Sequence, residues 1–336
     1  MRMPESVWFP AAGTVELRTE PSQPVGPNDV RVAAHVSGVS AGSELLVYHG
    51  EAPDDLPPDL PTVDGDFQLP IKFGYASVGK VVETGNDVQL LAPDDLVFVH
   101  HPHQTEYVVP ADFPITLPKD LPPERGIFTA NLETAVTVVL DAHPRFGDSV
   151  LVVGQGIVGL LVTMVLGETG ARPVITVDLH ERRREASIRA GAHEALLPGE
   201  GLTARVLEMT GGRGVDVAIE ASGSPAALQS CIDAAAFGAT VVVASWYGTR
   251  AVPVGLGGAF HRRRLRMVSS QVSTLDPAIF PRWDRDRRTG LVKDLLTELP
   301  LQDLISHRFP LTAAASAYEL LDKKPEECLQ VVLDYV

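Results

Sequence analysis

The pattern of apolar and polar positions changes character near residue 122. Before this point, short β-branched runs at 30–32, 76–82 and 96–99 are separated by clusters of Gly, Pro and Asp. Such punctuation predicts a β-rich region. The stretch 53–70 is rich in Pro and Asp and has no periodicity, so we expect a surface loop there.

After this point, a helical pattern from 124 to about 140 is followed by alternating strand and helix patterns up to about residue 272. The predicted strands are 149–153, 174–177, 215–220, 240–245 and 265–269, and the predicted helices are 157–169, 181–190, 202–210 and 225–237. This alternation indicates a parallel sheet with helices on both faces.

The last stretch of the chain, 277–336, predicts one helix and two short strands at 305–310 and 330–333. We expect it to rejoin the first domain, because about 60 residues bury little surface alone. The predicted domains are therefore 1–121 together with 277–336, and 122–276.

Composition narrows the class of protein. The chain has 336 residues, of which 45% are hydrophobic and 21% charged, as in a globular protein of about two domains. The net charge of −15 disfavours binding to nucleic acid. Cys231 and Cys328 are the only cysteines, which excludes a Cys-rich zinc site and a disulfide framework and fits a reducing cytoplasm. Because we find no signal peptide pattern and no run of about 18 apolar residues, we expect a cytoplasmic protein with no membrane contact.

The strongest motif follows the strand predicted at 149–153 and opens the next helix. It is a G-x-G-x-x-G pattern formed by Gly154, Gly156 and Gly159. In this pattern the first glycine makes a tight turn, the second lets the backbone approach a pyrophosphate, and the third allows close packing of helix and strand. The amides of Ile157 and Val158, at the start of the helix, would hold the pyrophosphate. The motif therefore predicts a dinucleotide site.

An acid at the end of the next strand, Asp178, bears on which dinucleotide binds. A carboxylate there accepts hydrogen bonds from the ribose diol and repels a 2′-phosphate, so NAD is favoured over NADP. Arg183, within a run of three arginines, could instead pair with that phosphate, and NADP stays open as the alternative. Residues in loops after the later strands are expected around the nicotinamide half of the dinucleotide; they are Ser222, Ser245, Tyr247 and Ser270.

The β-rich first part, the later dinucleotide motif and the C-terminal return together resemble the medium-chain dehydrogenase/reductase superfamily over essentially the whole chain. The resemblance implies an α/β fold with a β-rich GroES-like catalytic domain and a doubly wound parallel-sheet (Rossmann) domain. The segments 40–44, 73–75, 102–105, 131–135, 245–248 and 269–272 are similar to the branch that contains bacteriochlorophyllide hydroxyethyl dehydrogenase. By the same resemblance we expect a homodimer or homotetramer that pairs the strand near 265–271.

The resemblance also implies that the catalytic zinc site is changed. Zinc enzymes of this superfamily hold the metal with a cysteine, a histidine of a Gly-His-Glu motif, and a later cysteine or acid. Here Ser40 stands at the cysteine position and Tyr75 at the histidine position, and only Glu133 keeps the third. Serine and tyrosine do not replace thiolate and imidazole, so no zinc is expected. As an alternative, His101 or His103 with Glu133 could form a new metal site.

Without zinc, hydrogen-bonding side chains must handle the substrate proton. The resemblance makes Tyr75 the first candidate for the proton donor and Ser43 the hydroxyl that relays the proton; a core tyrosine and a helix cap are the alternatives. His103 is a third candidate, because an imidazole could exchange protons with solvent near neutral pH. Glu133 could orient Tyr75 or His103, or bind substrate hydroxyls.

The function predicted from these residues is an NAD-dependent, zinc-independent oxidoreductase. It would interconvert a secondary alcohol and a ketone on a ringed or polyhydroxylated small metabolite. Two alternatives stay open: an NAD(P)H-dependent quinone or enone reductase, and an NAD(H)-binding protein without catalytic activity.

Overall fold

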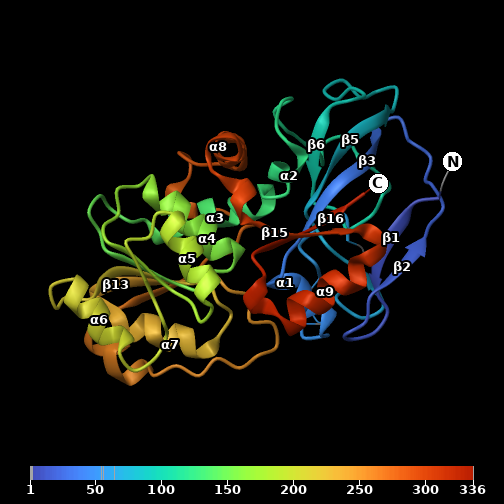
Figure 1. Ribbon diagram of the computed structural model, residues 1–336. Helices are drawn as coiled ribbons and strands as arrows, with labels where there is room; N and C mark the ends of the chain where they lie inside the picture. Colours follow the sequence, from blue (N-terminus) through green and yellow to red (C-terminus); the bar gives the residue numbers. More distant parts are fainter. Residues whose placement is uncertain (1–2, 54, 56, 64, 336) are drawn as a thin grey trace. The chain divides into compact units, whose positions relative to one another are not determined.

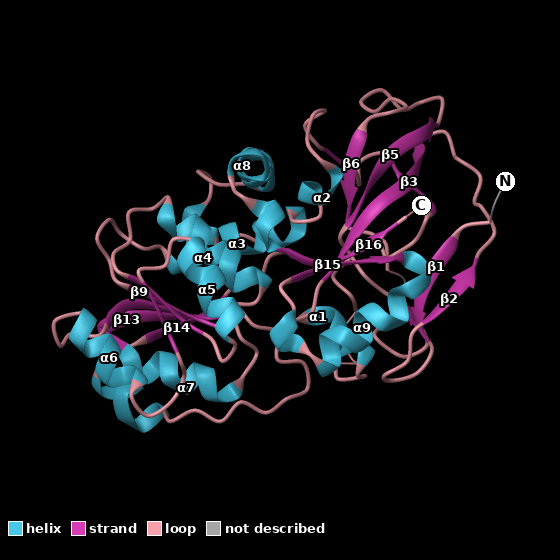
Figure 2. Ribbon diagram, in the orientation of Figure 1, coloured by secondary structure: helices cyan, strands magenta, loops and turns pink. Residues whose placement is uncertain are grey.

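The computed structural model describes residues 3–53, 55, 57–63 and 65–335, which form two compact units (Figures 1 and 2). Unit 1 comprises Met1–Ala130 and Lys293–Val336, and unit 2 comprises Asn131–Val292. The two division points lie further along the chain than the predicted boundaries after residues 121 and 276. Both fall inside helices, α3 (Thr129–Ala142) and α8 (Arg285–Glu298), where no break in the pattern marks them.

Unit 1 is built on two β-sheets. The smaller sheet has the order β2-β1-β4, and the larger has the order β15-β16-β3-β5-β6-β8, with β7 paired to β3. The strands are β1 (Glu5–Phe9), β2 (Glu16–Thr19), β3 (Asp29–Val39), β4 (Ile71–Lys72), β5 (Ser77–Thr84), β6 (Leu96–Val99), β7 (Glu106–Pro110), β8 (Ile115–Thr116), β15 (Ile305–Pro310) and β16 (Gln330–Asp334). The helices are α1 (Ser43–Tyr48), α2 (Pro123–Gly126) and α9 (Ala314–Lys323).

The C-terminal segment is an integral part of unit 1. Strand β16 pairs antiparallel with β3, with Val331 opposite Val39. Helix α9 packs its buried Tyr318 into a core that also holds Phe9 and Val47. The described residues from 277 to 335 carry two α-helices, α8 and α9, besides short 3-10 turns, rather than the single helix predicted. Helix α8 begins with Arg-Asp-Arg-Arg, so its first turn gives little apolar periodicity to detect.

Unit 2 is a six-stranded parallel sheet with the order β11-β10-β9-β12-β13-β14. Its strands are β9 (Val150–Val153), β10 (Val174–Val177), β11 (Glu194–Leu196), β12 (Val215–Glu220), β13 (Ala235–Val243) and β14 (Arg266–Ser269), and its further helices are α4 (Ile157–Gly167), α5 (Glu181–Arg189), α6 (Leu202–Met209) and α7 (Pro225–Ala234). The chain moves outward from β9 to β11 and then returns to β12 on the other side of β9. Ligands bind at such a reversal, outside the carboxyl ends of the strands.

The predicted fold class, a β-rich part and a doubly wound parallel sheet, is confirmed. The structure differs from the prediction in where some elements begin and in one additional strand. Strand β13 begins directly after α7, at Ala235 rather than at residue 240, because the apolar run through Phe237 has no break between helix and strand. Strand β11 was not predicted; its three residues are too few to show an alternation.

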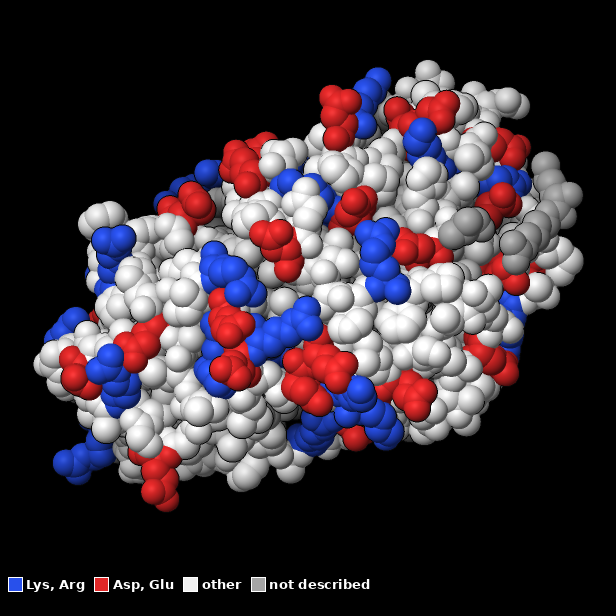
Figure 3. All heavy atoms as spheres, in the orientation of Figure 1, with Lys and Arg blue, Asp and Glu red and all other residues white. Residues whose placement is uncertain are grey.

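Strand β14 is one edge of the unit 2 sheet, and the homodimer or homotetramer expected through this edge stays a prediction. On the face drawn in Figure 3, acidic and basic side chains are interspersed. Within the described ranges, none of the helices combines the length and the apolar character needed to cross a membrane.

Candidate functional site

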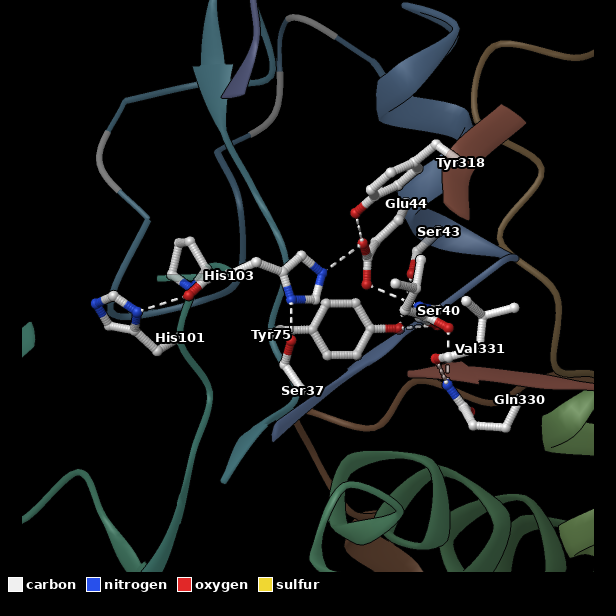
Figure 4. Close-up of polar contacts among 12 residues, drawn as sticks. Ser37, Ser40, Ser43, Glu44, Tyr75, His101, His103, Tyr318, Gln330 and Val331 are labelled. Carbon is white, nitrogen blue, oxygen red and sulfur yellow. Dashed lines mark hydrogen bonds and ion pairs between the residues drawn. The ribbon is translucent and has the colours of Figure 1, made fainter. Parts of the chain in front are cut away.

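Three hydroxyl groups from separate segments of unit 1 lie within hydrogen-bonding distance of one another (Figure 4). Ser40 directly follows β3, Ser43 begins α1, and Tyr75 lies between β4 and β5. The phenol of Tyr75 donates a hydrogen bond to Ser40 Oγ and lies 2.7 Å from Ser43 Oγ. The N-cap residue of α1 is Gly42, so Ser43 does not act as the helix cap considered above. We call these three residues the hydroxyl cluster.

Burial and charge act together on the phenol of the hydroxyl cluster. Burial, and then the negative charge of Glu44, raise the pKa of Tyr75 to about 12. The hydrogen bonds of the phenol with Ser40 and Ser43 oppose the shift without cancelling it. The phenol therefore keeps its proton throughout the neutral range.

Glu44, which the sequence analysis missed, fixes the hydroxyl cluster through a hydrogen bond to the backbone of Ser40. Its side chain is fully buried, and Oε1 accepts a hydrogen bond of 2.8 Å from the backbone N–H of Ser40. The second oxygen accepts a hydrogen bond from the Tyr318 hydroxyl and lies 3.0 Å from His103 Nε2. These partners lie 274 and 59 residues away along the chain, so no local pattern could have indicated them.

His103 lies inside unit 1 with 0% of its surface exposed. Its Nδ1 is 2.7 Å from Ser37 Oγ, which in turn lies 2.8 Å from the Tyr335 hydroxyl. Because both ring nitrogens have protein partners and the ring is buried, direct proton exchange with solvent, as predicted for His103, is wrong. The ring also lies against Gly74, where an added Cβ would come within 2.7 Å of His103 Cδ2.

His101 belongs to a different contact. Its ring stacks on Tyr107 at 3.6 Å between centroids, and its Nδ1 lies 2.8 Å from the carbonyl oxygen of Pro102. Burial lowers the pKa of His101 to about 3. The imidazole is therefore neutral at physiological pH.

In unit 2, the glycine motif forms a turn that only glycine can make at two positions. Gly154 has a φ of +96°, and a Cβ there would lie 2.6 Å from the backbone of Ser222. At Gly159 a Cβ would lie 1.9 Å from the carbonyl oxygen of Gly154. At Gly156, by contrast, an added Cβ would meet no atom of the described residues within 4 Å. The structure thus leaves open space where a pyrophosphate would approach the backbone.

Gly156 is the N-cap of α4, and Ile157 and Val158 form the start of its first turn. Among the described residues, no side chain caps this helix end. Amides at a free helix N-terminus suit an anionic group. The geometry thus fits the pyrophosphate of a dinucleotide.

Asp178 directly follows β10 and is nearly buried. Its Oδ2 accepts a hydrogen bond of 2.7 Å from the backbone N–H of Gln155, and its Oδ1 accepts one of 2.8 Å from that of His180. The carboxylate therefore fixes the glycine turn, a role that the sequence did not indicate. Arg183 is half-buried on α5, and Arg184 donates to the carbonyl oxygens of residues 178 and 179.

Two of the four residues expected near the nicotinamide half contact one buried acid, Glu220, and a third contacts the loop that follows this acid. Ser222 and Tyr247 both donate hydrogen bonds to the Glu220 carboxylate, and Ser245 Oγ accepts one of 2.8 Å from the backbone N–H of Gly223. Ser270 follows β14 and is hydrogen-bonded instead to Asp141 on α3. Glu220 itself was not singled out from the sequence.

Comparison with known proteins identifies the family. Residues 158–284 match the family described as zinc-binding dehydrogenase. The chain is 30% identical to (R,R)-butanediol dehydrogenase of Bacillus subtilis over 261 residues, which covers 69% of this chain and 72% of the relative. The chain belongs to the zinc-binding dehydrogenase family. The expected medium-chain dehydrogenase/reductase resemblance is confirmed, and the protein is a medium-chain alcohol dehydrogenase.

Longer alignments agree. The dehydrogenase is 27% identical to D-guloside 3-dehydrogenase of Escherichia coli over 326 residues, covering 90% of this chain and 92% of the relative. It shares its fold with the crystal structure of 2R,3R-butanediol dehydrogenase from Bacillus subtilis, with a TM-score of 0.81, 21% identity, and coverage of 98% and 99% of the two chains. The expected GroES-like and Rossmann domains follow from this fold.

The donor groups of this dehydrogenase do not fit the zinc that its family name implies. Zinc takes thiolate, imidazole or carboxylate ligands, whereas Ser40 and Tyr75 offer hydroxyls, and the pKa of about 12 keeps the Tyr75 phenol protonated. Glu133, nearly buried on α3, is paired with Arg288 at 3.3 Å. In the described part of the chain, no three His, Cys, Asp or Glu side chains group in a way that would hold a metal ion.

Two glycine variants separate folding from dinucleotide binding in this dehydrogenase. Gly159→Ala should lower the free energy of unfolding by about 1–3 kcal/mol, because the new methyl group collides with the Gly154 carbonyl. Gly156→Ala should change it by less than about 0.5 kcal/mol, because the φ of −67° suits alanine and the space is open.

Both variants should bind the nicotinamide dinucleotide, NAD(H) or NADP(H), more weakly than the unaltered protein. Denaturant unfolding and dinucleotide titration measure the two effects. Unaltered binding by Gly156→Ala would show that the dinucleotide backbone does not approach this residue.

Proposed function

We propose that the protein is an NAD-dependent, zinc-independent dehydrogenase that interconverts a secondary alcohol and a ketone on a ringed or polyhydroxylated small metabolite. The hydroxyl cluster carries this proposal, because it stands at two of the positions where zinc enzymes of the superfamily hold their metal. The names of the relatives, D-guloside 3-dehydrogenase and (R,R)-butanediol dehydrogenase, support a polyhydroxylated or secondary alcohol as substrate.

The bound dinucleotide supplies the hydride acceptor or donor. Tyr75 supplies the proton in the reductive direction: its phenolic hydrogen turns from Ser40 Oγ to the carbonyl oxygen of the bound substrate. An alkoxide is a much stronger base than a phenolate, so this transfer is favourable even with the pKa of Tyr75 at about 12. The hydroxyl of Ser43, 2.7 Å from the phenol, orients it, and passes a proton taken up from solvent to the phenolate that the transfer leaves.

The preference for NAD rests on Asp178. Its carboxylate stands at the end of β10, where it would accept hydrogen bonds from the ribose diol and repel a 2′-phosphate. Arg184, in the neighbouring run of arginines, is occupied by the carbonyl oxygens of residues 178 and 179. This contact leaves Arg184 poorly placed to compensate a phosphate charge.

Removal of one hydroxyl tests the role of Tyr75. Tyr75→Phe should lower kcat for NADH-dependent reduction of cyclic ketones by about 10²–10⁴-fold, the usual contribution of a general acid. The Kd for NADH should stay unchanged, because the phenol does not hold the cofactor. The unaltered enzyme should lose no activity from Tyr75 ionisation up to about pH 10, since the proton donor form persists below the pKa of about 12.

Tyr107→Phe is the matched control. Tyr107 is another buried tyrosine of unit 1, and its hydroxyl donates to Ser77 at 2.9 Å. Its loss should change turnover by less than about twofold, with any cost confined to stability. Equal losses in the two variants would contradict a special role for Tyr75.

Metal content tests zinc independence directly. Protein purified without a metal-affinity tag should contain far less than one zinc per chain, because the donor groups suit the metal poorly. NADH-dependent ketone reduction should survive treatment with EDTA. One zinc per chain, together with loss of activity on chelation and recovery on adding zinc, would overturn this part of the proposal.

The cofactor preference has its own test. Asp178→Ser removes the charge that repels a 2′-phosphate, so the ratio of the Kd for NADP⁺ to the Kd for NAD⁺ should fall by about tenfold, or about 1.4 kcal/mol. Absolute affinities should fall as well, because Asp178 also holds the glycine turn through Gln155. An unchanged ratio would mean that another group selects the dinucleotide.

A further inference from the structure

Glu220, the last residue of β12, is a fully buried carboxylate stabilised by hydrogen bonds. Its Oε1 accepts hydrogen bonds from the backbone N–H of Ser222 at 2.7 Å, from Ser222 Oγ at 2.6 Å, and from the backbone N–H of Gly223 at 3.1 Å. Its Oε2 accepts a hydrogen bond of 2.6 Å from the Tyr247 hydroxyl. No basic side chain of the described residues forms an ion pair with it.

The surroundings of Glu220 fit a negatively charged group. Each of its hydrogen-bond partners donates to the carboxylate, and a carboxylate anion can only accept hydrogen bonds. Burial and the neighbouring Glu220 raise the pKa of the Tyr247 phenol, and the same two causes raise the pKa of the Cys231 thiol. Because no Lys, Arg or His side chain in the described part of the chain pairs with this carboxylate, the field of its charge extends through the low-dielectric interior around it.

The position of Glu220 is at the reversal of the unit 2 sheet. Glu220 pairs with Val153 on β9, the residue before the glycine turn. The backbone of the glycine turn packs against the loop that follows Glu220, since a Cβ on Gly154 would be 2.6 Å from the Ser222 backbone. This reversal is where a dinucleotide binds.

The two halves of the dinucleotide lie on opposite sides of the reversal. Asp178, directly after β10, marks the adenosine side, so the nicotinamide half extends toward β12 and β13. These are the strands whose loops carry Ser222, Ser245 and Tyr247. The charge of Glu220 is therefore on the nicotinamide side.

We propose that Glu220 sets the relative affinity of the enzyme for oxidised and reduced dinucleotide, in favour of the oxidised form. This inference rests on the proposed function, because it requires a nicotinamide dinucleotide as cofactor. The nicotinamide ring carries a positive charge in NAD⁺ and is neutral in NADH, whereas the rest of the molecule is the same. An uncompensated buried anion on this side therefore stabilises only one of the two forms by charge.

The consequence is a lower reduction potential for the bound couple. Tighter binding of NAD⁺ than of NADH makes bound NADH a stronger hydride donor. A tenfold change in the ratio of the two Kd values corresponds to about 30 mV for this two-electron couple. Glu220 thus favours ketone reduction by the bound cofactor without contact with the substrate.

The test compares equilibrium binding of NAD⁺ and NADH, titrated separately, to the unaltered protein and to Glu220→Gln. Glutamine keeps the shape and one acceptor oxygen but removes the charge. The ratio of the Kd for NAD⁺ to the Kd for NADH should rise by about tenfold, equivalent to about +30 mV for the bound couple. Asp178→Asn is the matched control: it also removes a carboxylate charge, but on the adenosine side, so both Kd values should change by the same factor.

Tyr247→Phe gives a second test in the opposite direction. It keeps the aromatic ring but removes one donor from Glu220, so the carboxylate is less screened. The ratio should fall by about two- to threefold. If Glu220→Gln does not fold, the ratio measured for Tyr247→Phe is sufficient to test the inference.

Each outcome has a definite meaning. If Glu220→Gln weakens NAD⁺ and NADH equally, or if Tyr247→Phe leaves the ratio unchanged, Glu220 only positions the loops and the inference is overturned. If the unaltered protein binds NADP⁺ and NADPH but not NAD⁺ and NADH, the cofactor in the proposed function is wrong, and an unshifted NADP⁺ to NADPH ratio in Glu220→Gln overturns the inference separately. If none of the four dinucleotides binds, both proposals fail.

Discussion

The buried carboxylate of Glu44 is the constraint on which the hydroxyl cluster of this dehydrogenase depends. A fully buried charge is costly unless donors satisfy it, and here the donors come from distant parts of unit 1. They are the Ser40 amide after β3, the Tyr318 hydroxyl on α9 and, at 3.0 Å, the His103 ring before β7. Because each partner must be in place for the charge to be tolerated, Glu44 ties the position of Ser40, and through it Tyr75, to the completed fold of the unit.

The enzyme meets the same cost in three different ways. Glu44 is satisfied by hydroxyl, amide and imidazole groups, whereas Glu133 is neutralised by Arg288, which also donates to Thr137 Oγ1 and the Val272 carbonyl oxygen. Glu220 has only neutral donors. An ion pair cancels the field of a carboxylate at a distance, whereas neutral donors satisfy its oxygens and leave most of the charge. The choice of partner therefore decides which of these acids still acts on its surroundings.

The local part of the fold and site could be predicted from the sequence, because the signals lie close together along the chain. The strand, the turn at Gly154 and the helix α4 are contiguous, so spacing alone predicts their arrangement. The contacts of Glu44 could not be predicted in this way, since its partners come from across unit 1. His103 was expected to reach solvent because nothing in the Pro-His-Gln-Thr segment shows that Ser37 and Glu44 enclose its ring. Even the glycine turn has one contact that the spacing of the motif does not predict, the hydrogen bond from the Gln155 backbone N–H to the Asp178 carboxylate.

A metal ion polarises a substrate oxygen by charge and needs only its ligands in place, whereas a hydroxyl acts through a single directed proton. A site that uses a hydroxyl in place of a metal ion therefore depends on the orientation of this hydroxyl rather than on a positive charge. Under the proposed function, Tyr75 meets this demand because its oxygen contacts two serines that are themselves held, Ser40 through Glu44 and Ser43 through α1. Burial raises the pKa of the phenol, and the carboxylate that fixes Ser40 adds to this shift. A hydroxyl cluster without that buried acid would be held more loosely, and would be less suited to directing a proton at one substrate oxygen.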